Sequence, residues 1–300
     1  MNNIIKNIPI AISGLLLAIF SLVNLYDIPL IKLILFSTGI IILTIILSKI
    51  VFYKDIVFKE LNQLVVLSTS GTFSMSLMIF STFLISFNDN LALIIWITGV
   101  VLHAILIMMF TYRYVFQKFN IEDVHASYWV VYVGITMASI TGLSFNIQDS
   151  TWIFFVFGFI MMLITLPVVT YRYIKYPVKL EQNKPLKSIY AALINILIVG
   201  YLNSFSNINI SFVMILYIIA SIFYIYSLYN FIKCIKMPFY PSYSAFTFPF
   251  VISAVASTKI YAITNYNPVI KYVVLIEISV ATILVLYVLI RYIQKYIVNS

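Results

Sequence analysis

Residues 91–112 read LALIIWITGVVLHAILIMMFTY, a run of 22 residues that contains no Asp, Glu, Lys or Arg. A helix needs about 20 mainly apolar residues to cross the hydrocarbon core of a bilayer. Nine more apolar runs of similar length flank this one, separated by short polar connections. The ten runs are Ile8 to Tyr26, Leu30 to Lys49, Leu64 to Ser86, Leu91 to Tyr112, Tyr128 to Phe145, Thr151 to Tyr173, Lys187 to Ser204, Asn209 to Phe231, Ser242 to Thr264 and Val269 to Arg291. The sequence therefore predicts an all-α integral membrane protein with ten transmembrane helices in one domain over residues 1–300.

Positive charge gathers on one side of this arrangement. Of the 18 Lys and Arg residues, 15 lie near the termini or around the connections after the second, fourth, sixth and eighth runs. The positive-inside rule places that side, with both chain ends, in the cytoplasm. We therefore expect a multi-pass protein of the plasma (cytoplasmic) membrane, which in a bacterium is the cell inner membrane, with the lipid bilayer as its partner.

The remaining composition excludes several classes of function. The net charge of +9 is spread over membrane-flanking connections and forms no basic domain, so a nucleic-acid partner is not expected. The one cysteine, Cys234, excludes an intrachain disulfide and a cysteine-built metal site. The acids, bases, nucleophiles and metal ligands that an intramembrane enzyme needs do not converge in the sequence. We therefore expect no enzymatic activity, no cofactor and no metal.

The odd-numbered and even-numbered runs differ in composition. Gly, Ala, Ser and Thr make up 38 of 101 residues in the odd runs but 21 of 111 in the even runs. Small and hydroxyl-bearing residues allow close helix packing or line a wet cavity, whereas bulky apolar residues suit lipid. We infer an inner ring of odd helices within an outer ring of even helices. The residues expected to line a pore are Ser70, Gly71, Ser74, Gly134, Thr136, Ser139, Ser253 and Ser257.

Few ionisable residues lie inside the runs. Lys259 and Glu277 are at similar depths in the ninth and tenth runs, which predicts an ion pair between adjacent helices. The alternative is that Lys259 projects into an outer vestibule and concentrates anions. His103, midway along the fourth run, is either a packed, hydrogen-bonded histidine or a proton relay, and the first is favoured.

The ninth run carries a proline next to a bulky aromatic residue. Pro249 cannot donate a backbone hydrogen bond and its ring crowds the carbonyl of Ala245, so a helix kink is expected there. Phe248 directly precedes this proline on a helix rich in small residues, where an aromatic side chain is able to plug a pore. The fifth and seventh runs contain no proline, so any bend in them would depend on Gly134, Gly142 or Gly200.

Three segments resemble the tellurite-resistance and C4-dicarboxylate transporter family, which includes the slow-type anion channels of plant guard cells. They are TFPF at Thr247 to Phe250, WVVYVGITMASITG at Trp129 to Gly142 and IPIAISGLLLAI at Ile8 to Ile19. The resemblance implies five helical hairpins in quasi-fivefold arrangement around a central pore, usually as a homotrimer. It also implies that a phenylalanine of the ninth helix occludes the pore, here Phe248, with Phe246 as second choice.

The favoured function is a passive channel for small anions such as chloride or nitrate. Hydroxyls, backbone dipoles and small residues offer an anion weak sites without a strong trap, and an acidic ring for cations is missing from the sequence. The alternative is a secondary transporter of C4-dicarboxylates or of oxyanions such as tellurite. Coupled carriers need ionisable residues for the coupling ion, and the candidates here are His103, Lys259 and Glu277.

Overall fold

The computed structural model describes residues 2–298, and it contains helices but no strand within that range. Residue 1 and residues 299–300 of the predicted domain lie outside the described residues. The inner helices are α2 (Ser13–Val23), α5 (Leu64–Thr69), α6 (Gly71–Leu84), α8 (Tyr128–Tyr132), α9 (Thr136–Gly142), α11 (Tyr190–Ser204) and α13 (Phe248–Ile263). The long outer helices are α3 (Pro29–Phe52), α7 (Asp89–Phe110), α10 (Gln148–Lys175), α12 (Ile210–Cys234) and α14 (Pro268–Ile293).

Short segments complete the chain. Two are α-helices, α1 (Asn2–Asn7) and α4 (Lys54–Leu61). Five have 3-10 geometry: η1 (Ile10–Ile12), η3 (Ile121–Asp123), η4 (Leu143–Phe145), η5 (Glu181–Ile189) and η6 (Pro241–Phe246). Two have π geometry: η2 (Thr111–Gln117) and η7 (Gln294–Val298).

Within the described residues, eight helices are long and apolar enough to cross a membrane. They correspond to eight of the ten predicted runs. The first run forms the shorter apolar helix Ile10–Val23. The fifth run is divided into α8, α9 and η4, so it contains no single long helix.

The two sets of helices differ in burial. The apolar windows of the outer helices are 22% to 33% buried, whereas those of the third, seventh and ninth runs are 50% to 83% buried. Every residue of α2 is buried. Isoleucine and leucine side chains dominate the exposed surface of α3, α7, α10, α12 and α14. This apolar outer surface suits contact with lipid, and the difference in burial agrees with the division predicted from small residues.

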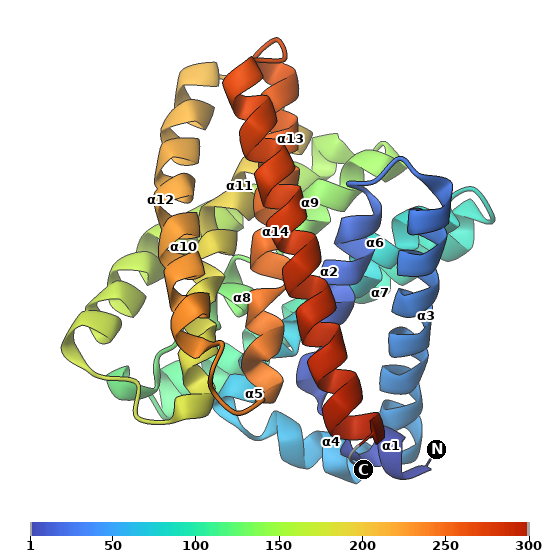
Figure 1. The fold of residues 1–300 in the computed structure, drawn as a ribbon, viewed down its shortest axis with the longest axis vertical. Helices are drawn as coiled ribbons and strands as arrows, with labels where there is room; N and C mark the ends of the chain where they lie inside the picture. The colour runs from blue at the N-terminus through green and yellow to red at the C-terminus, as the bar shows by residue number, and fades with distance from the viewer. Residues whose placement is uncertain (1, 299–300) are drawn as a thin grey trace.

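The inner helices contact one another in a closed order. α2 contacts α6, α6 contacts α9, α9 contacts α11, α11 contacts α13, and α13 returns to α2. The segment η6, which precedes α13, also approaches α2 closely, because a Cβ atom added at Gly14 would lie 2.9 Å from Ser244 Cβ. Each inner helix also packs against the long helix that follows it. Figure 1 shows the long helices standing around this centre.

Both chain ends lie at the same end of the molecule, where α1 contacts η7 (Figure 1). We call this end the terminal face; it includes α4 and the connections 118–127, 176–182 and 235–240. Hydrogen bonds join its parts, including Tyr114 Oη to Asn62 O (2.8 Å) and Ser242 Oγ to Gln182 O (2.5 Å). The terminal face is therefore a continuous layer of connected segments.

A buried lysine anchors the first inner element to this face. Lys49 is 1% exposed, pairs with the Glu60 carboxylate and donates to Ile8 O at 2.6 Å. Glu60 also accepts from the backbone N–H of Ile10 at 3.0 Å. The pairing satisfies a charge that burial alone would make unfavourable, and it fixes where η1 and α2 begin.

Each inner element changes direction or helix type partway along its length. In the ninth run, η6 ends at Phe246 and α13 begins at Phe248, so the kink predicted at Pro249 takes the form of a break at Thr247. In the fifth run the break lies between α8 and α9, around Gly134. In the seventh run η5 passes into α11 at Tyr190, and Pro185 lies inside η5, upstream of the predicted run. Gly200 lies within the continuous helix α11.

Candidate functional site

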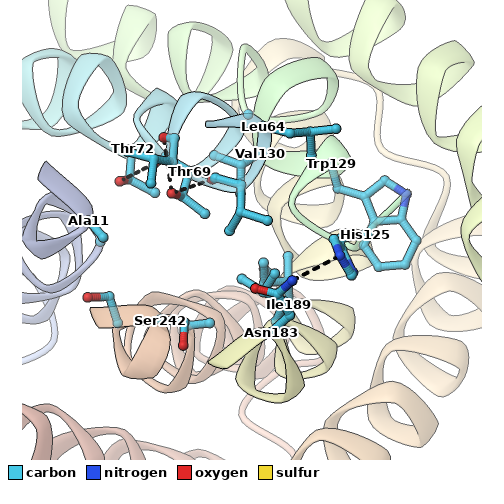
Figure 2. Close-up of a pocket in the computed structure, with 18 of the residues that line it drawn as sticks. Ala11, Leu64, Thr69, Thr72, His125, Trp129, Val130, Asn183, Ile189 and Ser242 are labelled. Carbon is cyan, nitrogen blue, oxygen red and sulfur yellow. Dashed lines mark hydrogen bonds between the residues drawn. The ribbon is translucent and has the colours of Figure 1, made fainter. Parts of the chain in front are cut away.

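A cavity of about 540 Å³ lies between the inner elements and opens among the connections of the terminal face. The five inner elements, by which we mean the five odd-numbered runs, all contribute residues to its wall. Figure 2 shows side chains from separate helices arranged around this space, including Ala11, Thr69, Thr72, His125, Val130, Asn183 and Ser242. The inner ring therefore encloses a real space over part of its length.

The cavity extends from the terminal face past the breaks in the third and seventh runs. Along the third run its wall extends from Gln63 to Met75, and along the seventh from Gln182 to Ile196. On the ninth run the last lining residues are Phe248 and Pro249. No described residue of α13 beyond Pro249 lines it. Along the ninth run the lining therefore ends at Phe248 and Pro249.

The lining is mainly apolar, with hydroxyls at intervals. Thr72 Oγ1 lies 2.7 Å from Ser13 Oγ, and Ser244 Oγ lies 2.8 Å from Tyr292 Oη. Thr69 donates to Val65 O of its own helix at 2.8 Å. The charged lining residues are Lys118 and Asp123, both exposed at the mouth. The deeper wall thus presents apolar groups and neutral dipoles to whatever enters.

The mouth contains a buried histidine. Asn183 Nδ2 lies 3.3 Å from His125 Nε2, and both side chains line the cavity. Burial, together with the smaller effect of the nearby positive charge of Arg172, lowers the pKa of His125 to about 4. Arg172 is itself buried and donates from Nε and Nη2 to Glu122 O, at 2.9 and 2.6 Å. The connection that carries His125 is therefore held by a neutral histidine and a buried guanidinium.

A smaller cavity of about 290 Å³ adjoins this mouth. Arg172, His125 and Asn183 contribute to its wall. Lys179 crosses its edge and pairs with Glu122 at 2.5 Å, which raises the pKa of the lysine. In the described part of the chain, no group of three or more His, Cys, Asp or Glu residues is arranged to hold a metal ion.

The two phenylalanines singled out in the sequence have different surroundings. Phe248 is 5% exposed and lines the cavity at its deep end. Phe246 is fully buried, with ring centroids 5.1 Å from Phe231 and 5.3 Å from Tyr243, and it does not line the cavity. Phe248 is therefore the aromatic residue positioned to close this space.

Three predicted pore-lining residues of the third run lie away from the cavity. Ser74 faces α7, where its hydroxyl lies 2.7 Å from His103 Nδ1. A Cβ atom added at Gly71 would lie 2.9 Å from Leu106 Cδ2, so this glycine serves close packing against α7. Ser70 donates to Leu67 O in its own run and does not line the cavity. Thr69 and Thr72 line it instead, because a helix turns about 100° per residue.

Four further predicted residues, Thr136, Ser139, Ser253 and Ser257, also lie away from the cavity, and their place in a pore stays a prediction. Ser139 donates to Thr151 O at 2.8 Å, and Asn195 Nδ2 donates to Ser253 Oγ at 2.9 Å. Thr136 Oγ1 would lie 2.2 Å from a Cβ atom at Gly158, so its side chain faces α10. Ser257 bonds residues of α12 and α14. Of the eight predicted lining residues, Gly134 alone lines the cavity.

The predicted ion pair between Lys259 and Glu277 is not formed. Glu277 accepts a hydrogen bond from Ser257 Oγ at 2.6 Å, and Tyr217 Oη lies 2.9 Å from the same hydroxyl. Lys259 is half-buried and makes no ion pair among the described residues. Lys259 and Glu277 lie at similar depths along their helices, but depth alone does not determine whether two side chains point toward each other. The vestibule role of Lys259 stays a prediction, because Lys259 does not line the cavity.

Sequence reasoning missed the mouth of the cavity. Lys118, His125 and Asn183 lie on connections, which were assigned only to topology. Their polar character is ordinary for loops at a membrane surface, so no sequence signal separates them from solvated neighbours.

A family model for SLAC1, described as a voltage-dependent anion channel, matches residues 7–293. This match confirms the family resemblance carried by the three sequence motifs. No curated protein matches the chain.

Proposed function

The chain belongs to the SLAC1 family of voltage-dependent anion channels, and from this premise we propose that it forms a passive channel for small anions such as chloride or nitrate. The family comprises membrane channels and transporters of anions. The proposed pore follows the axis of the inner ring and passes through the cavity behind Phe248. The observation that carries the proposal is a cavity walled by all five inner elements, in which Phe248 and Pro249 are the last lining residues of the ninth run.

We propose ten transmembrane helices arranged as five hairpins around a quasi-fivefold axis. The closed order of contacts from α2 through α6, α9, α11 and α13 supports this arrangement. On this proposal α2 crosses with η1, and α8 and α9 cross together as one broken helix. Breaks at membrane depth are tolerated where the backbone is buried in protein or lines a cavity, which is the situation of the inner runs.

The lining supports selectivity for anions over cations. Its single carboxylate, Asp123, lies at the exposed mouth near Lys118, and no acidic ring surrounds the cavity. Hydroxyl and backbone dipoles bind a small anion weakly, so an ion is able to leave as readily as it enters. Phe248 then provides an apolar constriction, where current is limited by the width of the passage.

We further propose that the terminal face is cytoplasmic, in a plasma membrane, because most Lys and Arg residues flank it. Assembly as a homotrimer is proposed from the family resemblance. The mass of the detergent-solubilised complex, compared with the 34.5 kDa chain, tests that proposal.

Secondary transport of a C4-dicarboxylate or an oxyanion is the second candidate. The observation that favours it is the cavity volume of about 540 Å³, which exceeds what one chloride or nitrate ion needs and lies in the range of small-molecule sites. A carrier would expose this cavity alternately to each side of the membrane, whereas a channel would open at Phe248.

Electrical recording on the purified protein in planar bilayers separates the two candidates. With gradients of chloride, nitrate or malate, a channel gives sustained currents that reverse near the equilibrium potential of the anion without a proton or sodium gradient. Protein-free bilayers and a potassium gradient with an impermeant anion serve as controls. Reversal at the potassium potential would overturn anion selectivity, and slow, saturable, gradient-coupled flux would favour the carrier.

A further inference from the structure

The break between α8 and α9 lacks a proline, yet it changes the backbone hydrogen bonding. Val133 N and Gly134 N both donate to Trp129 O, at 2.8 and 3.0 Å. After the break, Thr136 N donates to Val133 O three residues back. Among the described backbone bonds, none uses the carbonyl of Val131 as acceptor. A buried carbonyl without a donor is unfavourable, so this break needs a partner from outside its own run.

His103 of α7 is that partner. Its side chain is fully buried, and Nε2 lies 3.0 Å from Val131 O. The other ring nitrogen, Nδ1, lies 2.7 Å from Ser74 Oγ of α6. The neutral ring satisfies both contacts when Nε2–H donates to the carbonyl and Nδ1 accepts the single Ser74 hydroxyl proton, for which Gly71 O at 2.8 Å is the competing acceptor. One outer-helix side chain thus ties two neighbouring inner runs at the level of the break.

The space around the ring is matched to glycine on both inner runs. A Cβ atom added at Gly134 would lie 3.0 Å from His103 Cε1, and one added at Gly71 would lie 3.3 Å from it. Gly134 lines the cavity, as does Val130 one turn before it. His103 therefore lies directly behind the cavity wall, although it does not line the cavity itself.

The surroundings of His103 contain no charged group. The segments packed around it are α6, α7, α8 and α9, and the one Asp, Glu, Lys or Arg on them is Asp89, at the far end of α7. A charged partner for the ring is therefore missing from these segments. The geometry favours a neutral hydrogen-bond donor over a proton relay.

We propose that His103 is a positioning residue for conduction, which holds the α8–α9 break so that Gly134 stays in the cavity wall. The inference rests on the proposed channel function. Without the Nε2–H donor, Val131 O is free to accept from Ile135 N and to close a regular helical turn. That closure removes the hollow at Gly134 and narrows the cavity just below Phe248.

The test compares three variants by single-channel recording in chloride. His103→Leu keeps a similar volume but removes the donor, whereas His103→Gln retains an N–H in a comparable position. Trp96→Phe is the matched control: Trp96 lies two turns earlier on α7 and donates to Thr141 Oγ1 of α9 at 2.8 Å, and neither residue lines the cavity. Thermal unfolding in detergent reports the stability of each variant.

We expect His103→Leu to lower unitary conductance roughly fivefold to tenfold, the population change that accompanies loss of one buried hydrogen bond. His103→Gln restores most of it, and Trp96→Phe lowers stability but leaves conductance unchanged. Equal conductance in His103→Leu and Trp96→Phe, with a conducting wild type, overturns the positioning role alone. A wild type that passes no anion current overturns the proposed function instead.

Discussion

The inner ring has two halves of similar composition and different use. In the open half, between the terminal face and Phe248, the runs surround a cavity of about 540 Å³. In the sealed half, beyond the last lining residues Met75, Gly134, Ile196 and Pro249, hydroxyls bond neighbouring helices, as Ser139 does to Thr151 O. Small polar residues therefore line the cavity in one half and allow close helix packing in the other. The direction in which each side chain points separates the two uses.

The largest effect on stability is expected at the mouth of the open half, from pH. The pKa of His125 is about 4 in the folded protein, below its ordinary value of 6.5, so the folded state binds fewer protons than the unfolded state between these values. Stability contributed by the neutral ring is complete above pH 6.5 and is lost as pH falls toward 4, by on the order of 3 kcal/mol.

Thermal unfolding of wild type and His125→Gln across pH 4 to 7.5 measures this contribution. Other groups titrate in both proteins, so the difference between the two curves isolates the histidine. Parallel curves would show that the His125 ring is not held neutral at the mouth.

The next effect concerns the sealed half and the partner of Glu277. Ser257→Ala removes the hydroxyl that donates to Glu277 at 2.6 Å, and we expect a loss of about 1–3 kcal/mol of stability. In a double-mutant cycle with Glu277→Gln, the two changes should couple by about 1 kcal/mol, because the second replaces the carboxylate acceptor of the same bond with a weaker, neutral amide oxygen.

A matched double-mutant cycle tests Lys259 in place of Ser257 as the partner of Glu277. Lys259→Ala and Glu277→Gln should add within about 0.5 kcal/mol, since the two side chains form no ion pair. If Glu277 coupled more strongly to Lys259 than to Ser257, the result would indicate that Lys259 and Glu277 form the ion pair predicted from their similar depths.

The smallest effect compares one hydroxyl from each half. Ser139→Ala in the sealed half removes the side-chain hydrogen bond that joins Ser139 to Thr151 O of α10, at a cost of about 1 kcal/mol. Thr69→Val in the open half should cost less than about 0.5 kcal/mol, because Thr69 bonds only carbonyls of its own run and faces the cavity. Unfolding temperatures in one detergent measure both, and equal losses would remove the distinction between the halves.

Much of the fold follows from local sequence. Eight of the ten apolar runs form helices of spanning length, and the excess of small residues in the odd runs agrees with their burial. Phe248 lines the cavity beside the break that the adjacent Pro249 indicates, and its role as the gate stays a prediction. Apolar length and proline act within a few residues, so the sequence alone reveals them.

The rest depends on contacts between distant segments. Of the eight predicted lining residues, Gly134 lines the cavity and the others contact neighbouring segments, because composition does not determine which face of a helix meets its neighbour. The break at Gly134 lies against His103, which is about 30 residues earlier on another helix. The mouth is built from connections brought together by the fold, among them those of His125 and Asn183.

The most direct test of the central claim, that anions pass through the open half and are stopped at Phe248, is the unitary chloride conductance of Phe248→Ala beside that of Phe246→Ala. Removing the ring that ends the cavity should raise conductance on the order of tenfold, equivalent to about 1.4 kcal/mol of barrier. Phe246→Ala should lower stability and leave conductance near the wild-type value, since Phe246 packs in the core. An unchanged current in Phe248→Ala, or an equal rise in both variants, would contradict the claim.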